Sequence, residues 1–331
     1  MEIIIMSNVK MMKAADVSDI HVNVPLSNMT VAYMQDTKDF IADKVFPVVP
    51  VSQISGRYFS FPKDSFLKNR AGKWTPGTKM HQTLFDVNNA DTYSCQFRAI
   101  EYPMPWHFKA AADSQLQFEY AAMAHITQQL LLNREQEWAT DFFAAGKWTT
   151  QPLAGTDFVA WDNFGTSNPI EDVLTYKDTV FGLTAKMPNT LVLPYNVYTQ
   201  LRLHPLIKEM YKFYQFPDVN ESALAKIFDV DKVLIARALS MNTADGSGDP
   251  LTVSNVYGKN AWLGYVPDAP GLMSPASGYI FSWNAMTAGF QIAVEKIPDQ
   301  RDKVDYLQAV MSYDQKLIGA DLGCFFRSVM T

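Results

Sequence analysis

The sequence predicts an α+β fold in which an extended two-stranded loop projects from a body that contains one long helix. Three observations lead to this expectation. Residues 43–61 combine strand-forming residues with interrupting prolines, residues 113–145 carry a long helical pattern, and residues 168–236 alternate helices with short apolar strands. Helices mixed with strands in this way are typical of a compact α/β or α+β subdomain.

Composition and charge exclude several classes of protein. The chain has 331 residues, a length at which about two domains are expected. Hydrophobic residues make up 48%, which supports a substantial core and excludes a disordered chain. The net charge is −6 and no basic run dominates, which argues against a dedicated nucleic-acid binder. A protein that merely encloses nucleic acid is still compatible with this charge.

The cysteines and the apolar segments indicate the cellular setting. Cys95 and Cys324 are the only cysteines, too few for a disulfide framework and wrongly spaced for a metal motif, so a reduced, cytosolic setting is expected. The apolar residues 3–6 follow Glu2 rather than a positive charge, which does not fit a secretory signal. No stretch approaches the ~18 apolar residues of a membrane span. We therefore expect a soluble protein that has neither an export signal nor a membrane-spanning segment.

Residues 43–61 predict an extended segment at the edge of a sheet. Val45, Phe46 and Val48 are strand formers, but Pro47 and Pro50 interrupt them. Proline has no backbone donor and is found in sheets at edges or bulges, so this segment is not a central strand. An apolar edge that leads into a polar, exposed arm indicates a chain that completes its packing on another chain.

A basic loop follows this edge. Residues 63–79 contain five Lys or Arg residues and one acid, Asp64. The flanking residues 58–61 and 93–99 alternate with period two and predict two strands, and such a ribbon is marginal in water unless it lies against its own body or a neighbour. A solvated loop, a phosphate site and an inter-subunit contact are the alternatives, and the proline-broken edge favours the contact. The residues expected to make it are Arg57, Lys63, Lys68, Arg70, Lys73, Trp74 and Lys79.

The longest helical pattern covers residues 113–145. Ser114 and Gln117 have the spacing of a capping box, and Gly146 suits a helix end. A helix of roughly 30 residues far exceeds the average of about 11–12 and indicates a structural rod. Trp138 and Phe142 are expected to pack against the C-terminal strands, at Phe325 and Phe326. The full packing face is expected to comprise Leu116, Tyr120, Met123, Leu130, Trp138 and Phe142.

The second half predicts a compact body. Asn168 and Pro169 form a helix start, and residues 190–193 and 233–236 are short apolar runs typical of buried strands. Residues 242–250 predict a polar loop. The buried face of the helix that starts at Pro169 is expected to comprise Ile170, Val173, Leu174, Val180 and Phe181. Further strands are expected at residues 261–266, 278–283, 290–297, 304–316 and 323–330.

The sequence contains no recognisable motif for catalysis, nucleotide binding or metal binding. No two of the five histidines have the i, i+4 spacing of a helical metal pair. A nucleophile elbow, a P-loop and a dinucleotide fingerprint are all missing. The segment 245–249 fails as a calcium loop because Met241 and Thr243 would occupy ligand positions. We therefore expect no enzyme activity, no cofactor and no metal.

Several segments together resemble the major capsid proteins of tailed bacteriophages. The similarity depends on their order and spacing over roughly residues 40–330, and no single motif carries it. The segments that carry it are residues 43–61, the basic loop, and residues 130–135, 142–148, 188–193, 258–261, 267–275 and 313–316.

The resemblance implies the capsid fold shared by tailed phages, herpesviruses and encapsulins. It implies a structural coat protein that self-assembles into pentamers and hexamers of an icosahedral shell around double-stranded DNA. Pro47 and Pro50 would hold the chain extended where the loop departs, and Gly56 would be its hinge. The implied domains are an N-terminal arm (1–42), an extended loop (50–81), a peripheral domain (43–49, 82–151 and 298–331) with a spine helix (113–145), and an axial domain (152–297).

The resemblance also implies partners and a location. These are portal, scaffolding and cement proteins, DNA enclosed without sequence-specific recognition, assembly in the bacterial host cytoplasm, and a final place in the virion capsid. Some relatives crosslink a loop lysine to an asparagine, but nothing in this sequence identifies that asparagine. The alternatives are an encapsulin-like compartment that holds protein cargo and a soluble enzyme of unknown chemistry.

Overall fold

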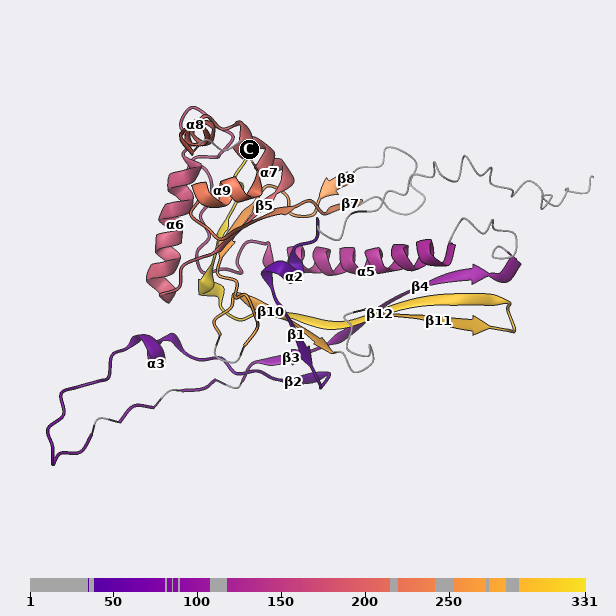
Figure 1. The fold of residues 1–331 in the computed structure, drawn as a ribbon, viewed down its shortest axis with the longest axis horizontal. Helices are drawn as coiled ribbons and strands as arrows, with labels where there is room; N and C mark the ends of the chain where they lie inside the picture. Colours follow the sequence, from indigo (N-terminus) through magenta and orange to yellow (C-terminus); the bar gives the residue numbers. More distant parts are fainter. Residues whose placement is uncertain are drawn as a thin grey trace, which may run out of the picture. The chain divides into compact units, whose positions relative to one another are not determined.

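The computed structural model describes residues 35, 39–80, 82–84, 86–88, 90–107, 118–214, 220–241, 253–271, 274–283 and 292–331 (Figure 1). Most of the expected N-terminal arm, the loop at 242–250 and Leu116 lie outside the described residues. The chain divides into two compact units. The first contains the described residues of Ile100–Thr127 and Val294–Ala309, and the second contains those of Gln35–Ala99, Gln128–Ala293 and Val310–Thr331.

A four-stranded sheet forms the centre of the second unit. Its order is β13-β9-β5-β6, with β5 parallel to β6 and antiparallel to β9. Strands β5, β9 and β13 are buried along their whole length, which explains their continuous apolar sequences. The bounds are Thr190–Pro194 for β5, Lys232–Ala236 for β6, Ala261–Gly264 for β9 and Gly323–Phe326 for β13.

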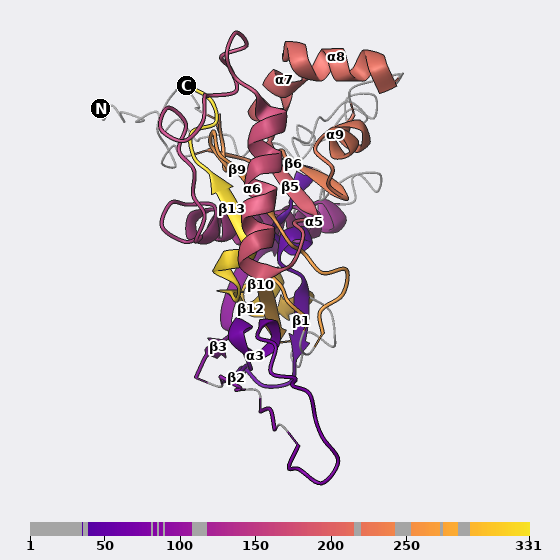
Figure 2. The ribbon, with the colours of Figure 1, turned by 90° about the vertical axis from the view of Figure 1, so that its left-hand side faces the viewer.

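Helices α6, α7 and α9 contact this sheet, and α8 contacts α7. Asn168 caps α6 by accepting a hydrogen bond from the Glu171 backbone, and a proline occupies the first turn, as the sequence predicts. Helix α6 contacts β9 and β13 and lies across them in Figure 2. Helices α7 and α9 contact β6. The bounds are Pro169–Thr184 for α6, Tyr195–Leu203 for α7, Pro205–Tyr214 for α8 and Glu221–Ile227 for α9.

The buried face of α6 is narrower than the sequence predicts. Val173 and Val180 are fully buried and Ile170 is partly buried. Leu174 and Phe181 are 38% and 46% exposed, so the expectation that they are buried is wrong. Val173 and Val180 are seven residues, about two turns, apart and lie on the row that faces the sheet. Leu174 and Phe181 each follow one of these residues and therefore lie on a neighbouring row that is turned away from the sheet.

The second sheet has the strand order β1-β10-β12-β11, with β4 also pairing β12. Strand β1 runs parallel to β10 and places Pro50 opposite Ser282. Among the described strands β1 lies at one end of this order, which confirms the edge position predicted from its proline. The bounds are Val48–Val51 for β1, Gln96–Pro105 for β4, Gly278–Trp283 for β10, Ala293–Asp299 for β11 and Val304–Leu317 for β12.

Strand pairing joins segments that the sequence assigns to different domains, and the domain assignment itself stays a prediction. Strand β10 falls within the expected axial range 152–297 but pairs with β1 and β12. Strand β13 falls within the expected peripheral range 298–331 but pairs with β9. Long-range strand pairing decides which segments share a sheet, and that pairing leaves no local trace in the sequence.

Helix α5, Phe118–Phe142, is 25 residues long, about twice the length of an average helix. It ends at Phe142 rather than at residue 145, and the expected start at residue 113 lies outside the described residues. Tyr120 is 72% exposed, so its expected place on the packing face is wrong. The buried row near the start of the helix is instead Ala122 and Ile126. Tyr120 precedes Ala122 by two residues, and residues two apart lie on different faces of a helix.

Aromatic side chains on the second half of α5 form a core. Leu130, Trp138 and Phe142 are buried, and Met123 is half-buried. The ring of Trp138 lies 5.5 Å from that of Phe46 and 5.9 Å from that of Tyr257.

The contact of this helix with the C-terminal strand differs from the expectation. Phe143, rather than Trp138 or Phe142, meets Phe325, at 5.1 Å between ring centroids. Phe326 packs instead against Phe158, Trp161 and Tyr176. Neighbouring residues on β13 point to opposite faces of the sheet, which sends the two phenylalanines to different cores.

The remaining described elements are short. A two-stranded ribbon pairs β2 with β3, and a second pairs β7 with β8. A short helix, α3, lies within the loop that β2 and β3 enclose, where the sequence predicted no helix. The bounds are Ala42–Val45 for α2, Ser55–Arg57 for β2, Lys63–Leu67 for α3, Thr92–Ser94 for β3, Leu239–Met241 for β7, Val253–Asn255 for β8 and Ala320–Leu322 for the 3₁₀ helix η3.

Candidate assembly surface

The base of the loop is the antiparallel ribbon of β2 and β3, which places Gly56 opposite Tyr93. A β-carbon on Gly56 would lie 2.7 Å from the Tyr93 hydroxyl, because the tyrosine ring covers the glycine. Any larger residue at this position would force the Tyr93 ring to move, so glycine favours the close approach of the two strands. The hinge role that we expect for Gly56 stays a prediction.

Aromatic stacking holds the ribbon on β10. The rings of Tyr93 and Tyr58 both stack on that of Phe281, at 4.7 and 5.4 Å between ring centroids. The Ser94 backbone also donates a 2.7 Å hydrogen bond to the Asp314 carboxylate on β12. A two-stranded ribbon is marginal by itself, so these contacts with the second sheet account for its order.

The two cysteines are buried and free. Burial, with a smaller contribution from the Asp314 charge, raises the pKa of the Cys95 thiol to about 11. Burial also raises the pKa of Cys324 well above its ordinary value. Both residues are therefore thiols at neutral pH and behave as core side chains.

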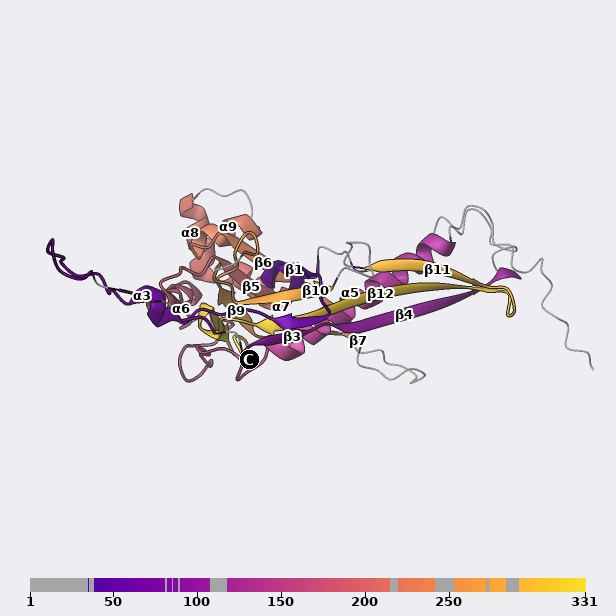
Figure 3. The ribbon, with the colours of Figure 1, turned by 90° about the horizontal axis from the view of Figure 1, so that it is seen from below.

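Beyond the ribbon, the described residues between 61 and 87 include α3 and form the outer part of this region. From here on, the extended loop means these residues. The perpendicular views of Figures 1 and 3 show it running out past the ends of β2 and β3. It exposes large apolar side chains, and Leu84 is 82% exposed. Apolar side chains gathered on an exposed segment indicate an interaction surface. The exposed apolar residues of the extended loop are Phe66, Leu67, Trp74, Met80, Leu84 and Val87.

The basic residues of this region fall into two groups. Lys63 pairs with Asp321, which also accepts a hydrogen bond from Thr149, and these contacts lower the pKa of the Asp321 carboxyl. Arg70 donates to the Leu84 carbonyl at 2.9 Å, so it braces the loop itself. The others are exposed and form no ion pair within the described part of the chain. They are Arg57, Lys68, Lys73 and Lys79.

The indole of Trp74 also contacts its own loop. Its nitrogen donates a 2.8 Å hydrogen bond to the Thr78 carbonyl, while 46% of the residue is exposed. The structure therefore fixes the orientation of this side chain and leaves its ring accessible. Of the predicted contact residues, Lys63 alone has an ion-pair partner in its own chain among the residues described.

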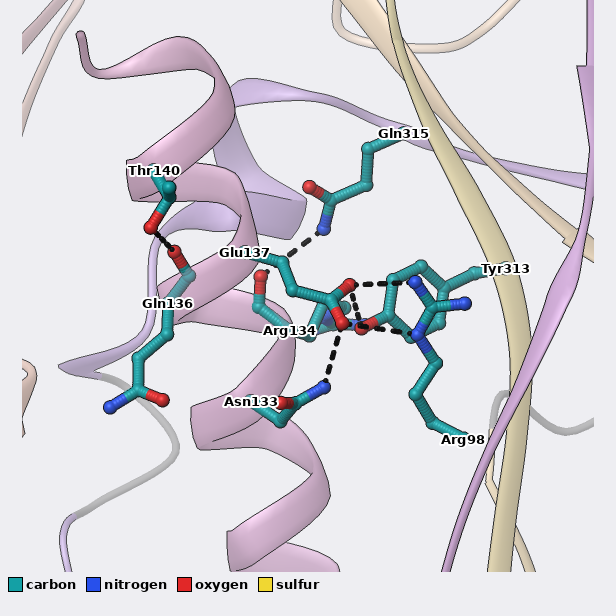
Figure 4. Close-up of polar contacts among 8 residues, drawn as sticks. All are labelled: Arg98, Asn133, Arg134, Gln136, Glu137, Thr140, Tyr313 and Gln315. Atoms are coloured by element: carbon teal, nitrogen blue, oxygen red, sulfur yellow. Dashed lines mark hydrogen bonds and ion pairs between the residues drawn. The ribbon is translucent and has the colours of Figure 1, made fainter.

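A polar cluster joins α5 to strands β4 and β12 (Figure 4). Arg98 makes two bonds to the Glu137 carboxylate, at 3.1 and 3.0 Å, and lies 4.7 Å from the centre of the Tyr313 ring. Tyr313 and Asn133 donate to the same carboxylate at 2.9 and 3.0 Å. A carboxylate that accepts this many hydrogen bonds fixes the positions of the bonded side chains relative to one another more than it adds to the stability of the fold.

A second carboxylate, which is buried, fixes the chain before β1. Glu135 accepts hydrogen bonds from the Ile41 and Ala42 backbones at 2.7 and 2.9 Å, and from the Tyr257 hydroxyl. Burial raises the pKa of Glu135, and the hydrogen bonds oppose that shift. Sequence reasoning did not identify this contact, because the residues lie about 90 and 120 positions apart, as in Ile41–Glu135 and Glu135–Tyr257.

Other kinds of site find no support in the described residues. Within them, no cluster of His, Cys, Asp and Glu has the geometry of a metal site. No helix in the same residues is long and apolar enough to cross a membrane.

The sequence and the fold were compared with those of known proteins. No family model matches the sequence. The chain is 24% identical to the major capsid protein of Burkholderia phage BcepMu, and the match covers 90% of this chain and 93% of that protein. A phage-related protein from Bordetella bronchiseptica has a similar structure, with a TM-score of 0.69, 22% identity, and coverage of 89% of this chain and 94% of that one.

The chain has the tailed-phage capsid fold. The capsid of cyanophage P-SCSP1u matches with a TM-score of 0.59 at 10% identity, covering 95% of this chain and 94% of that one. An encapsulin complex from Synechococcus elongatus matches with a TM-score of 0.54 at 10% identity, covering 94% and 97%. Together with the similar phage protein, these matches support a structural coat protein.

Proposed function

We propose that this coat protein assembles into pentamers and hexamers of an icosahedral shell that encloses double-stranded DNA. The observation that carries the proposal is the extended loop, whose base is held firmly on β10 while its outer residues are apolar, basic and uncovered. Such a segment gains stability when a second subunit covers it. Many contacts of this kind per subunit make a closed shell cooperative.

The proposal assigns a structural role without catalysis. The buried carboxylate of Glu135 and the half-buried carboxylate of Glu137 both serve as hydrogen-bond acceptors that join elements of the fold. The cysteines are held as thiols by burial. The similarity to a major capsid protein supports the same conclusion.

We also infer the arrangement of the parts within a shell. The four-stranded sheet with α6 to α9 would form the axial domain at the centre of each pentamer or hexamer. The second sheet with α5 would form the peripheral domain. Strand β13 would then belong to the axial domain and β10 to the peripheral domain, in line with their hydrogen bonding.

The remaining partners are part of the same proposal. Portal, scaffolding and cement proteins would act with the shell, and the site of assembly would be the bacterial host cytoplasm. DNA would be enclosed without sequence-specific recognition, in keeping with the net charge of −6. The mature location would be the virion capsid.

Electron microscopy and sedimentation of the full-length protein test the proposal. Wild-type protein should form capsomers or closed shells, and replacing Leu67, Trp74 and Leu84 together with serine should reduce them strongly. Val159 is 41% exposed and lies outside the loop, so Val159→Ser is the matched control and should assemble normally. Wild-type protein that stays a single chain at high concentration would contradict the proposal.

An encapsulin-like compartment is the second candidate, because the encapsulin match covers nearly the whole chain. The contents of purified particles separate the two. Nuclease-resistant double-stranded DNA would support the phage shell, whereas a co-purifying cargo protein without DNA would support the compartment.

A further inference from the structure

Helix α8 presents three parallel rows of side chains. Ile207 and Tyr211 are buried and form the middle row against the core. Residues four apart lie on one face of a helix, so Leu206 and Met210 form one neighbouring row, and Lys208 and Lys212 form the other. The two outer rows therefore flank the buried row on opposite sides.

The flank with Leu206 and Met210 faces α6 across a groove of about 450 Å³. We call this the acidic groove. Its floor is apolar, because it includes Leu174, which is 38% exposed, and Leu206, which is 36% exposed. Carboxylates of Glu171, Asp178 and Glu209 line it, and no basic side chain does.

The flank with Lys208 and Lys212 lines a second hollow together with Leu203, Pro205 and Glu209, so Glu209 borders both hollows. We call this the basic flank. Leu203 is 49% exposed, so this flank also combines apolar surface with charge. Neither lysine forms an ion pair with another residue in the described stretches of the chain. Two surfaces of opposite charge, each built around exposed leucine, thus lie on the two sides of one helix.

We propose that the basic flank of one subunit docks in the acidic groove of the next subunit around a ring. The inference rests on the proposed function, because it places this contact within a pentamer or hexamer. Rings require head-to-tail contacts, in which two different surfaces of each subunit meet. A protein with complementary surfaces on opposite sides of one helix meets that requirement with identical copies.

Charge complementarity selects a second copy as the occupant. The groove is lined by three carboxylates and no ammonium group, whereas the hollow on the basic flank is lined by two ammonium groups and one carboxylate, that of the shared Glu209. Opposite charges across an interface steer encounter and fix register, while like charges oppose it. The contact would also cover Leu174, Leu203 and Leu206, which their own chain leaves exposed.

Charge reversal tests the contact. The first variant combines Lys208→Glu with Lys212→Glu, and the second combines Glu171→Lys with Asp178→Lys. Each variant alone would bring like charges together where the basic flank of one subunit meets the acidic groove of the next. The protein concentration needed to form capsomers should therefore rise about tenfold or more. The control combines Lys147→Glu with Lys186→Glu, which changes the same charge at exposed positions outside both flanks and should assemble like wild type.

Two rescue experiments make the test specific to a ring. A chain that carries all four reversals has exchanged the charges of the four substituted residues, with the shared Glu209 unchanged, and should regain assembly. A mixture of the two variants should form alternating rings, which close with six chains but not with five. Native mass spectrometry distinguishes these masses, and circular dichroism of each variant checks that it is folded.

The outcomes separate this inference from the function on which it rests. Wild-type assembly with loss in each variant and recovery in the combined chain would support it. Equal assembly of wild type and both charge-reversed variants would overturn the docking contact and leave the shell function standing. Wild-type protein without capsomers would overturn both.

Discussion

Replacing Tyr93 with alanine should release the ribbon from the body while the body stays folded. The Tyr93 ring is half-buried, stacks on Phe281 at 4.7 Å and covers Gly56 on the opposite strand. Tyr58 also stacks on Phe281 and is unchanged in the variant. The substitution therefore removes one of the two aromatic contacts that hold the ribbon on β10.

The expected loss is about 2 kcal/mol. A stacked aromatic pair contributes roughly 0.5–1.5 kcal/mol beyond the area that it buries. Burial of half the ring adds about 1 kcal/mol, half of the ~1.5–3 kcal/mol for a large apolar side chain that is fully buried. A loss of about 2 kcal/mol shifts the equilibrium between docked and undocked ribbon by roughly 30-fold.

Hydrogen exchange of the backbone amides measures this equilibrium. Protection of Ser55–Arg57 and Thr92–Ser94 should fall about 30-fold, while protection of the four-stranded sheet is unchanged. Tyr93→Phe keeps the ring and is the matched control, with protection close to wild type. Unchanged ribbon protection in Tyr93→Ala would refute the stacking argument, and an equal loss of protection throughout the second unit would refute its local character.

Three further predictions follow from the same contacts. Gly56→Ala should weaken the ribbon by about 1 kcal/mol in wild type, and by less in the Tyr93→Ala background, where the obstructing ring is gone. Glu137→Gln should lower the free energy of unfolding in urea by about 2 kcal/mol, because it leaves a largely buried guanidinium unpaired. Asp321→Asn should flatten the acid limb of the stability profile. The Asp321 pKa is lowered in the fold, so its contribution is present above its ordinary pKa of 3.8 and is lost as pH falls through the lower folded value.

Local signals in the sequence predicted several elements well. Asn168 and Pro169 mark the start of α6, and the proline in β1 indicates an edge strand. The continuous apolar run at residues 190–193 is fully buried, as expected. Capping, proline geometry and strand burial depend on neighbours in the chain, which is why these predictions needed no tertiary information.

The features that the sequence did not reveal depend on distant contacts. The Cys95 thiol donates a hydrogen bond to the carbonyl of Phe281, which lies nearly 190 positions further along the chain. Tyr58 and Tyr93 stack on the ring of Phe281, and no local pattern in the sequence indicates this stacking. Tyr120 has the right spacing for the packing face, but another row of α5 is the one buried.

The candidate surface was predicted in part. Its basic residues are visible in the sequence, whereas the intrachain pair of Lys63 with Asp321 appears only in the fold. The exposed apolar residues between Phe66 and Val87 have no sharp pattern, because a surface that is covered only after assembly has no periodic burial within its own chain.

The central claim is that the extended loop of one chain is covered by another chain in a closed shell. A cryo-electron microscopy map of the purified, full-length protein tests it most directly. We predict an icosahedral particle in which Leu67, Trp74 and Leu84 lie against a neighbouring subunit. Particles in which these residues face solvent, or a sample that contains only single chains of 37.3 kDa, would contradict the account.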